Sequence, residues 1–248
     1  MAIIFSMLLL SLATIVLGHG RLTDPPSRST AHRYGFNTPF NDMDHQLSCG
    51  GYWNQWGINN GRCGVCGDPY QGPRENEAGG KYATGTIVRS YKEGQQINVE
   101  IEITVAHNGG WSEFRICPNN DVNKAVTQQC LDQFLLATPS GETRYIHQKT
   151  TGKFNIPLVL PPGLTCTQCV LQWKWNAASH NNCDPVTHEC CKGCGPQEQF
   201  YGCADVSVEK TSSGTSGFHP KTTKSPFRPV FTRNTQPNGF IPIDIRSG

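Results

Sequence analysis

Residues 97 to 105 read INVEIEITV, the stretch of the chain in which apolar and polar side chains alternate most strictly. Successive side chains of a β-strand point to opposite faces of a sheet, so this alternation indicates a strand with one buried and one solvated face. The segment Ile97–Val105 is the strongest structural signal in the sequence, and it predicts a strand of a β-sheet.

Shorter strand-like runs occur on both sides of this segment, at residues 86–90, 113–117, 154–160, 170–175 and 204–208. Clusters of Gly, Pro and Asn separate the runs, and no long stretch has helical periodicity, so we predict an all-β fold, an antiparallel β-sandwich. The region from Arg21 to Gly80 shows little strand pattern. We expect it to form disulfide-pinned loops with one or two short helices.

The composition of the 248 residues is that of a loop-rich, cross-linked globular protein. It includes 26 Gly, 17 Pro and 12 Cys, with 36% hydrophobic and 16% charged residues. This composition excludes a collagen, a coiled coil and a wholly disordered chain. The 21 basic and 19 acidic residues give a net charge of +2, which argues against a general nucleic-acid binder.

Both ends of the chain differ from the middle. Residues 3–17 are almost continuously apolar and end before the small residue Gly18. The run is shorter than the about 20 residues of a membrane span, so we predict a signal peptide at 1–18 that is cleaved to leave His19 at the N-terminus. No second apolar span follows. We therefore expect a secreted, soluble protein with no membrane partner. We also expect it to act as a monomer.

After Val208 the sequence becomes rich in Ser, Thr and Pro, with eight Ser or Thr between residues 211 and 225. This bias predicts a disordered tail over 211–248 and a single folded domain over 19–210. The tail is basic and the domain mildly acidic. We favour a solvated tail over one that contacts an anionic surface.

The twelve cysteines all lie between residues 49 and 203. Because we expect export to an oxidising compartment, we predict that they form disulfides, whose connectivity the spacing does not define. The alternative is that the pairs Cys63/Cys66, Cys166/Cys169 and Cys191/Cys194 are zinc knuckles or redox motifs.

A histidine at a free N-terminus offers ligands that an internal histidine lacks. The α-amino group and imidazole of His19 could chelate one metal ion, and an α-amine has a pKa of about 8, low enough to lose its proton to a metal near neutrality. A second imidazole would complete three nitrogens, a set that suits copper(II). A zinc site of His19, His107 and a carboxylate is the alternative.

The best candidate for the second imidazole is His107, because it follows the alternating strand directly and is followed by Gly109 and Gly110. That position places it at an edge of the sandwich, where a site can open to solvent. We interpret the other histidines as ordinary surface residues, with His32 or His147 as neighbours of the site. They are His32, His45, His147, His180, His188 and His219.

Several spaced motifs resemble those of the secreted lytic polysaccharide monooxygenases, most closely the enzymes of auxiliary-activity family fifteen. The resemblance covers essentially all of residues 19–208. Its motifs are HGRLTDPPSRSTAHRYGFNTP at 19–39, CGG at 49–51, GRCGVCGDP at 61–69, NEAGGKYATGTIVRSY at 76–91, FRICP at 114–118, LPPGLTCTQCVLQWKWNA at 160–177 and GCGPQEQFYGCADVSV at 193–208.

The resemblance implies an immunoglobulin-like or fibronectin III-like sandwich with a flat copper face on which His19 and His107 hold one copper ion. It further implies oxidative cleavage of glycosidic bonds in crystalline polysaccharide, with an external electron donor and hydrogen peroxide or dioxygen as co-substrate. Chitin is the preferred substrate and cellulose the second.

The same resemblance assigns roles to three further residues. Phe200 matches the aromatic position on the axial side of copper, with its neighbour Tyr201 as the alternative. Glu198 lies two residues before Phe200 and hence on the same face of a strand, and it resembles the polar residue that hydrogen-bonds the oxygen co-substrate. The motif Val105-Ala106-His107 departs from the Ala-Asn-His common in the family, which leaves the residue packing against copper unassigned.

A flat binding surface would need aromatic side chains near His19, and four are candidates: Tyr34, Trp53, Trp56 and Trp111. We expect most of them in the core, because large aromatic residues of sandwiches are usually buried. Two other functions compete with the enzyme, since a fold does not determine a function. One is a non-catalytic polysaccharide-binding or defence protein, and the other is a structural protein of an extracellular matrix.

Overall fold

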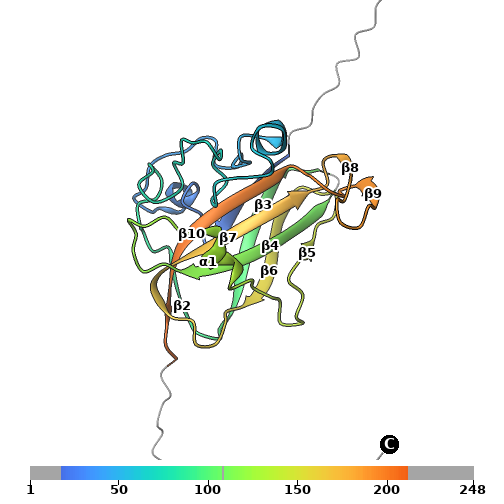
Figure 1. Ribbon diagram of the computed structural model, residues 1–248. Coiled ribbons are helices and arrows are strands. Elements are labelled where there is room, and N and C mark those ends of the chain that lie inside the picture. Colours follow the sequence, from blue (N-terminus) through green and yellow to red (C-terminus); the bar gives the residue numbers. More distant parts are fainter. Residues whose placement is uncertain (1–17, 108, 212–248) are drawn as a thin grey trace, which may run out of the picture. The chain divides into compact units, whose positions relative to one another are not determined.

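A computed structural model describes residues 18–107 and 109–211, and it consists mainly of two stacked β-sheets (Figure 1). The smaller sheet has three strands in the order β1-β3-β6 and the larger has five in the order β2-β10-β7-β4-β5. Within each sheet all pairs are antiparallel except β2 with β10, which is parallel. The predicted antiparallel β-sandwich is confirmed, with this one parallel pair added.

The three-stranded sheet consists of β1 (His19–Asp24), β3 (Gln96–Val105) and β6 (Gly152–Val159). The five-stranded sheet consists of β2 (Arg89–Lys92), β4 (Gly110–Pro118), β5 (Tyr145–Ile146), β7 (Cys166–Ala177) and β10 (Gln199–Glu209). A separate hairpin pairs β8 (Asn181–Cys183) with β9 (Cys190–Lys192). The helices are short: a 3-10 helix at Ala31–Tyr34, a π-helix at Trp53–Ile58 and α1 at Gln128–Asp132.

Strand β3 has the half-buried character that its alternation predicts. Its apolar side chains Ile97, Val99, Ile101 and Ile103 are each at most 3% exposed, whereas the polar residues between them lie on the outer face. The apolar face packs against the inner face of the larger sheet, where Trp173, Trp175 and Phe114 are fully buried. Each such side chain contributes about 1.5–3 kcal/mol to folding, so this interface is the main source of stability.

Strands β7 and β10 are buried on both faces, because the loops between residues 21 and 80 cover the outer face of the larger sheet (Figure 1). The backbone N–H of Tyr201 donates to the carbonyl of Leu47, and the amide of Gln172 donates to the carbonyl of Val65. A strand covered on both sides needs no polar face, which explains why VLQWKW at 170–175 alternates so little.

Four strands, β1, β5, β8 and β9, were not predicted from the sequence, and one predicted strand is displaced. Strand β1 extends into the region from Arg21 that we expected to lack strands. It carries one large apolar side chain, Leu22, and is recruited by pairing with β3. The run expected at 86–90 is a strand at Arg89–Lys92 instead. The 3-10 and π-helices confirm the expectation of short helices within these loops.

All twelve cysteines form disulfides, so the zinc-knuckle and redox alternatives are wrong. Two of the Cys-x-x-Cys motifs close on themselves, and the third is split between two bridges. The pairs are Cys49–Cys63, Cys66–Cys203, Cys117–Cys130, Cys166–Cys169, Cys183–Cys190 and Cys191–Cys194. Such a density of bridges suits an oxidising, extracellular environment.

Within residues 18–107 and 109–211, no helix has the length and apolar character that crossing a bilayer would require. The signal peptide predicted at 1–18 lies outside the described residues apart from Gly18. The tail predicted at 211–248 lies outside them apart from Thr211.

The Cys66–Cys203 bridge ties the covering loops to β10 across 137 residues of sequence, whereas Cys191–Cys194 closes a loop of three. A bridge that closes a long loop removes more entropy from the unfolded chain. We expect the double substitution C66A/C203A to lower the free energy of unfolding by about 3–5 kcal/mol. Urea denaturation followed by circular dichroism measures this change.

The matched control for this prediction is C191A/C194A, which removes an exposed bridge on the β8–β9 hairpin. Its effect should be smaller by at least about 2 kcal/mol, because the closed loop is so short. Equal losses in the two double variants would show that Cys66–Cys203 does not anchor the loops.

Candidate functional site

The pairing of β1 with β3 places the first residue of β1 beside the end of β3. His19 is in register with Val105, and His107 lies two residues further along the chain. Gly18, which precedes His19, donates its backbone N–H to Nε2 of His107 over 2.9 Å. The two histidines singled out in the sequence, 88 residues apart, are thus brought to the same end of the sandwich.

Glu198 and Phe200 complete the surroundings of His107. Nε2 of His107 lies 2.8 Å from a carboxylate oxygen of Glu198, and both side chains are 7% exposed. The ring of Phe200 is 6.1 Å from the His107 ring between centroids, and the Trp175 indole is 5.8 Å away. The site therefore has a carboxylate on one side of the imidazole and an apolar wall of two aromatic rings on the other.

Tyr201 lies on the opposite face of β10 from Phe200, as expected for consecutive residues of a strand. Its hydroxyl donates to the side-chain carbonyl of Gln199 over 2.8 Å, and its backbone N–H contacts the covering loops. Burial raises the pKa of the Tyr201 phenol. The structure therefore brings Phe200, and not Tyr201, to the side of β10 that faces His107.

A third histidine, His45, lies against His19 with its ring in a T-shaped arrangement at 4.8 Å. Burial lowers the pKa of the His19 imidazole, and the nearby His45 lowers it further. His45 is held by its neighbour Asp44, whose fully buried carboxylate also binds Arg21 and Arg33. The sequence contains no signal for His45, because the loop that carries it has no regular spacing relative to β1 or β3.

His180 lies on the other flank of the site. Its ring stacks on Tyr52 at 3.9 Å between centroids, and burial lowers the pKa of its imidazole, an effect that the nearby Glu198 opposes. Gln197 is fully buried and fixes this loop. Its side-chain carbonyl accepts the backbone N–H groups of Ser179 and His180, and its amide donates to the His180 carbonyl.

The two histidines predicted as neighbours of the site lie elsewhere. His147 is buried one ring behind it, 5.9 Å from Trp175, and its Nε2 shares a 2.7 Å hydrogen bond with the hydroxyl of Ser112. His32 packs against Phe40 at 5.1 Å between ring centroids. The histidines that do flank His19 and His107 are His45 and His180.

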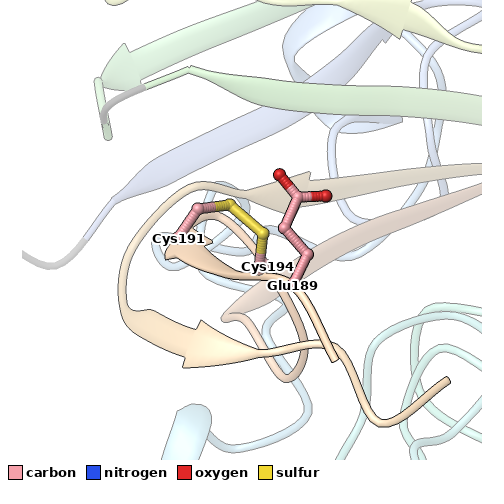
Figure 2. A group of neighbouring side chains, drawn as sticks. All are labelled: Glu189, Cys191 and Cys194. Atoms are coloured by element: carbon pink, nitrogen blue, oxygen red, sulfur yellow. A yellow bond between two sulfur atoms is a disulfide. The ribbon is translucent and has the colours of Figure 1, made fainter. Parts of the chain in front are cut away.

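Glu189, Cys191 and Cys194 form another group with potential metal ligands, on the β8–β9 hairpin. Figure 2 shows the sulfur atoms of Cys191 and Cys194 joined in a disulfide beside the Glu189 carboxylate. A metal binds a thiolate, which a disulfide lacks. This group is therefore not a metal site in the oxidised protein.

The four aromatic side chains considered for a binding surface are not in the buried core, so that expectation is wrong. Tyr34 is 41% and Trp53 71% exposed. Trp56 donates its indole N–H to the Gln197 carbonyl, and Trp111 is covered by the guanidinium of Arg144 at 4.0 Å. Trp53 directly follows Tyr52, whose ring stacks on His180 at the flank of the site.

Comparison with known proteins decides the family. Residues 19–206 match the family model described as "lytic polysaccharide mono-oxygenase, cellulose-degrading". This chain belongs to the lytic polysaccharide monooxygenase family. The match spans three quarters of the sequence and begins at His19.

One solved structure supports this assignment, and a second is a more distant match. A lytic polysaccharide monooxygenase of auxiliary-activity family fifteen from Thermobia domestica, solved in the Cu(I) state, is 43% identical. The alignment covers 77% of this chain and 98% of that one, with a TM-score of 0.72. An enzyme of the family from Listeria monocytogenes is 16% identical over 77% of this chain and 99% of that one, with a TM-score of 0.47. No curated protein sequence matches the chain.

The protein is thus a copper-dependent lytic polysaccharide monooxygenase, an oxidoreductase that cleaves polysaccharide with an external electron donor. This confirms the enzyme class, the immunoglobulin-like sandwich and the copper cofactor predicted from the sequence. The two non-enzymatic alternatives are set aside by the same comparison.

The buried histidine behind the site gives a testable pH dependence. Burial lowers the pKa of His147 to about 4 from the ordinary 6.5. Between these values the unfolded chain binds a proton that the folded protein does not. The free energy of unfolding should therefore fall as the pH falls from 6.5 to about 4, by up to about 1.4 kcal/mol per pH unit.

We expect His147→Gln to flatten this decline, because it keeps a partner for Ser112 and removes the titrating ring. Urea denaturation at pH 7, 5.5 and 4.5 measures the effect. The control is His188→Asn, which removes an exposed histidine at a positive φ that asparagine tolerates. A His147 resonance titrating near pH 6.5 in the folded protein would contradict the prediction.

Proposed function

We propose that the mature enzyme begins at His19 and holds one copper ion with the α-amine and imidazole of His19 and the imidazole of His107. The observation that carries this proposal is that the pairing of β1 with β3 brings His19 to the end of the sandwich where His107 contacts Glu198 and Phe200. The domain is proposed to act as a secreted monomer on chitin, with cellulose as the second substrate.

The contacts of Gly18 support the fit of a metal at this point. Its N–H donates to Nε2 of His107, and a Cβ on Gly18 would fall 2.1 Å from Cδ2 of that ring. The backbone preceding His19 thus occupies the space in front of the imidazole nitrogen that a metal would take. Cleavage after Gly18 would vacate this space and convert the peptide nitrogen of His19 into an α-amine, which can bind a metal.

The nitrogen donors and their protonation also suit copper(II), which favours tetragonal nitrogen ligation. Burial lowers the pKa of the His19 imidazole, which favours the neutral form that a metal requires. Phe200 offers no ligand atom, so its ring would only exclude water from the buried side. Zinc, the alternative, would need a carboxylate ligand in addition to these nitrogens.

Copper supplies the one-electron chemistry that activates dioxygen or hydrogen peroxide after reduction by an external donor. The chain's own residues have simpler roles. Glu198 can hold a proton at the carboxylate oxygen that faces His107 and pass it to the co-substrate. Phe200 and Trp175 keep bulk water out behind the imidazole. In the sugar, hydrogen is replaced by hydroxyl at carbon 1 or carbon 4, and elimination then breaks the glycosidic bond.

Two consecutive aromatic residues, Tyr52 near the site and the exposed Trp53, suit a polysaccharide substrate. The hydroxyl of Tyr52 accepts a hydrogen bond from Asn182 of the β8–β9 hairpin, and its ring stacks on His180. Trp53, 71% exposed, is the next residue. A sugar ring can stack on such side chains, whose burial contributes about 25 cal/mol per Å² of apolar surface.

Copper titration tests the ligand set. A protein that starts at His19 should bind one copper with a tetragonal nitrogen spectrum in electron paramagnetic resonance. Since altering even an outer-shell partner costs 10- to 100-fold in metal affinity, loss of the ligand in His107→Ala should cost at least about 100-fold. A protein that retains Gly18 should lose similar affinity, because its His19 nitrogen is an amide.

The control for the titration is His188→Asn, which removes a histidine remote from the site and should bind copper normally. Tight binding that survives both His107→Ala and retention of Gly18 would overturn the proposed ligands.

Product analysis tests Glu198 and the substrate together. Glu198→Gln keeps the shape of the side chain and removes no proposed ligand, so copper should still bind, whereas release of oxidised oligosaccharides should fall about 10- to 100-fold. Mass spectrometry of products from chitin and from cellulose, with a reductant and hydrogen peroxide, measures this loss. If Glu198→Gln released oxidised oligosaccharides as fast as the unaltered enzyme, the proposed role of Glu198 would be wrong. If oxidised products appeared from cellulose alone, the proposal that chitin is the substrate would be wrong.

A further inference from the structure

A cavity of about 460 Å³ lies against the outer face of the five-stranded sheet, on the opposite side of β10 from His107. Its floor is a row of three neighbouring strands in which Glu113, Lys174 and Tyr201 are in register. Segment 56–70 and helix α1 form its walls. The volume is within the range of about 300–1,000 Å³ that is typical of small-molecule sites.

The lining of this cavity is cationic. Arg62, Arg115 and Lys174 line it, against a single carboxylate, Asp132, which pairs with Arg115 at 3.0 Å. In the same row, the Glu113 carboxylate pairs with Arg115 at 2.5 Å and with Lys174 at 3.6 Å. The folded domain as a whole is mildly acidic, so a positive excess here is local and not a property of the whole surface.

One of the cations, Lys174, is largely buried, and it shares the carboxylate of Glu113 with Arg115. Lys174 is 21% exposed, and its burial lowers the pKa of its ammonium group, although Glu113 lies beside it. A buried cation is stabilised by a further anionic partner at hydrogen-bonding distance. An anion entering the cavity would meet Lys174 and Arg115 together.

Aromatic side chains provide flat apolar surfaces around the charged floor. Trp56 and Tyr70 line the walls, and Tyr201 contributes to the floor. The Tyr70 ring is held between two guanidinium groups, those of Arg62 at 4.3 Å and Arg74 at 5.0 Å. These contacts fix the ring at the rim, where its edge remains available to a planar ligand.

We propose that this cavity binds a small aromatic carboxylate, with its carboxylate on Lys174 and Arg115 and its ring between Trp56 and Tyr70. The site is separate from the metal ligands, since one layer of sheet lies between them and the two share no lining residue. The proposal therefore does not depend on the proposed function, and each can fail without the other.

Isothermal titration calorimetry with 4-hydroxybenzoate tests the proposal on the whole disulfide-bonded protein. We expect saturable one-to-one binding, and at least about tenfold weaker binding of the neutral isostere 4-hydroxybenzamide, because the lost interactions are charge-assisted. The indole N–H resonance of Trp56 should shift on titration with the carboxylate and report the location of binding.

Two variants and one control separate this site from non-specific attraction. Arg62→Gln changes an exposed residue at the rim, which leaves folding intact, and should weaken binding about threefold or more; Lys174→Gln should weaken it about tenfold or more. The control Arg89→Gln removes one positive charge from β2, outside the cavity, and should bind like the unaltered protein.

Three results would overturn the proposal. They are the absence of saturable binding, equal affinity for the carboxylate and the amide, and binding by Arg62→Gln that matches Arg89→Gln. If Lys174→Gln fails to fold, the rim variant and the amide comparison still decide the question.

Discussion

The site depends on the antiparallel pairing of β1 with β3. The register of His19 with Val105 brings a residue near the start of the domain to the end of a strand that lies about 85 residues further on. The apolar face of β3 is buried against Trp173, Trp175 and Phe114, so β3 cannot slide without exposing its isoleucines. The position of His19 is therefore set by the most strongly buried interface in the molecule.

Strand β10 connects two regions with different chemistry. Its inner face carries Phe200 toward His107, and its outer face carries Tyr201 toward the cationic cavity. Both faces are covered, one by the second sheet and the other by loops that Cys66 ties to Cys203. Because neighbouring residues of one strand serve both regions, the packing that holds the proposed metal ligands also shapes the cavity.

The surroundings of His19 and His107, the proposed metal ligands, come from loops, and their order is maintained by buried polar groups. The Asp44 carboxylate gathers two arginines and His45 beside His19, and Gln197 satisfies the backbone of the loop that carries His180. A buried carboxylate or amide left without partners costs several kcal/mol, so each of these groups confines its loop to one arrangement. In this way irregular segments attain the precision that the sheets have by regular pairing.

The sequence by itself determined the sandwich and the disulfide-rich character, and it predicted the pair His19 and His107, because alternation, cysteine content and a terminal histidine are local signals. It also placed Glu198 and Phe200 on one face, since residues two apart on a strand share a side. Only the tertiary structure decided that β1 is a strand, that His45 and His180 flank the site, and that Tyr201 faces a cationic cavity. Those facts depend on contacts between segments far apart in sequence, where no local periodicity records which side chains will meet.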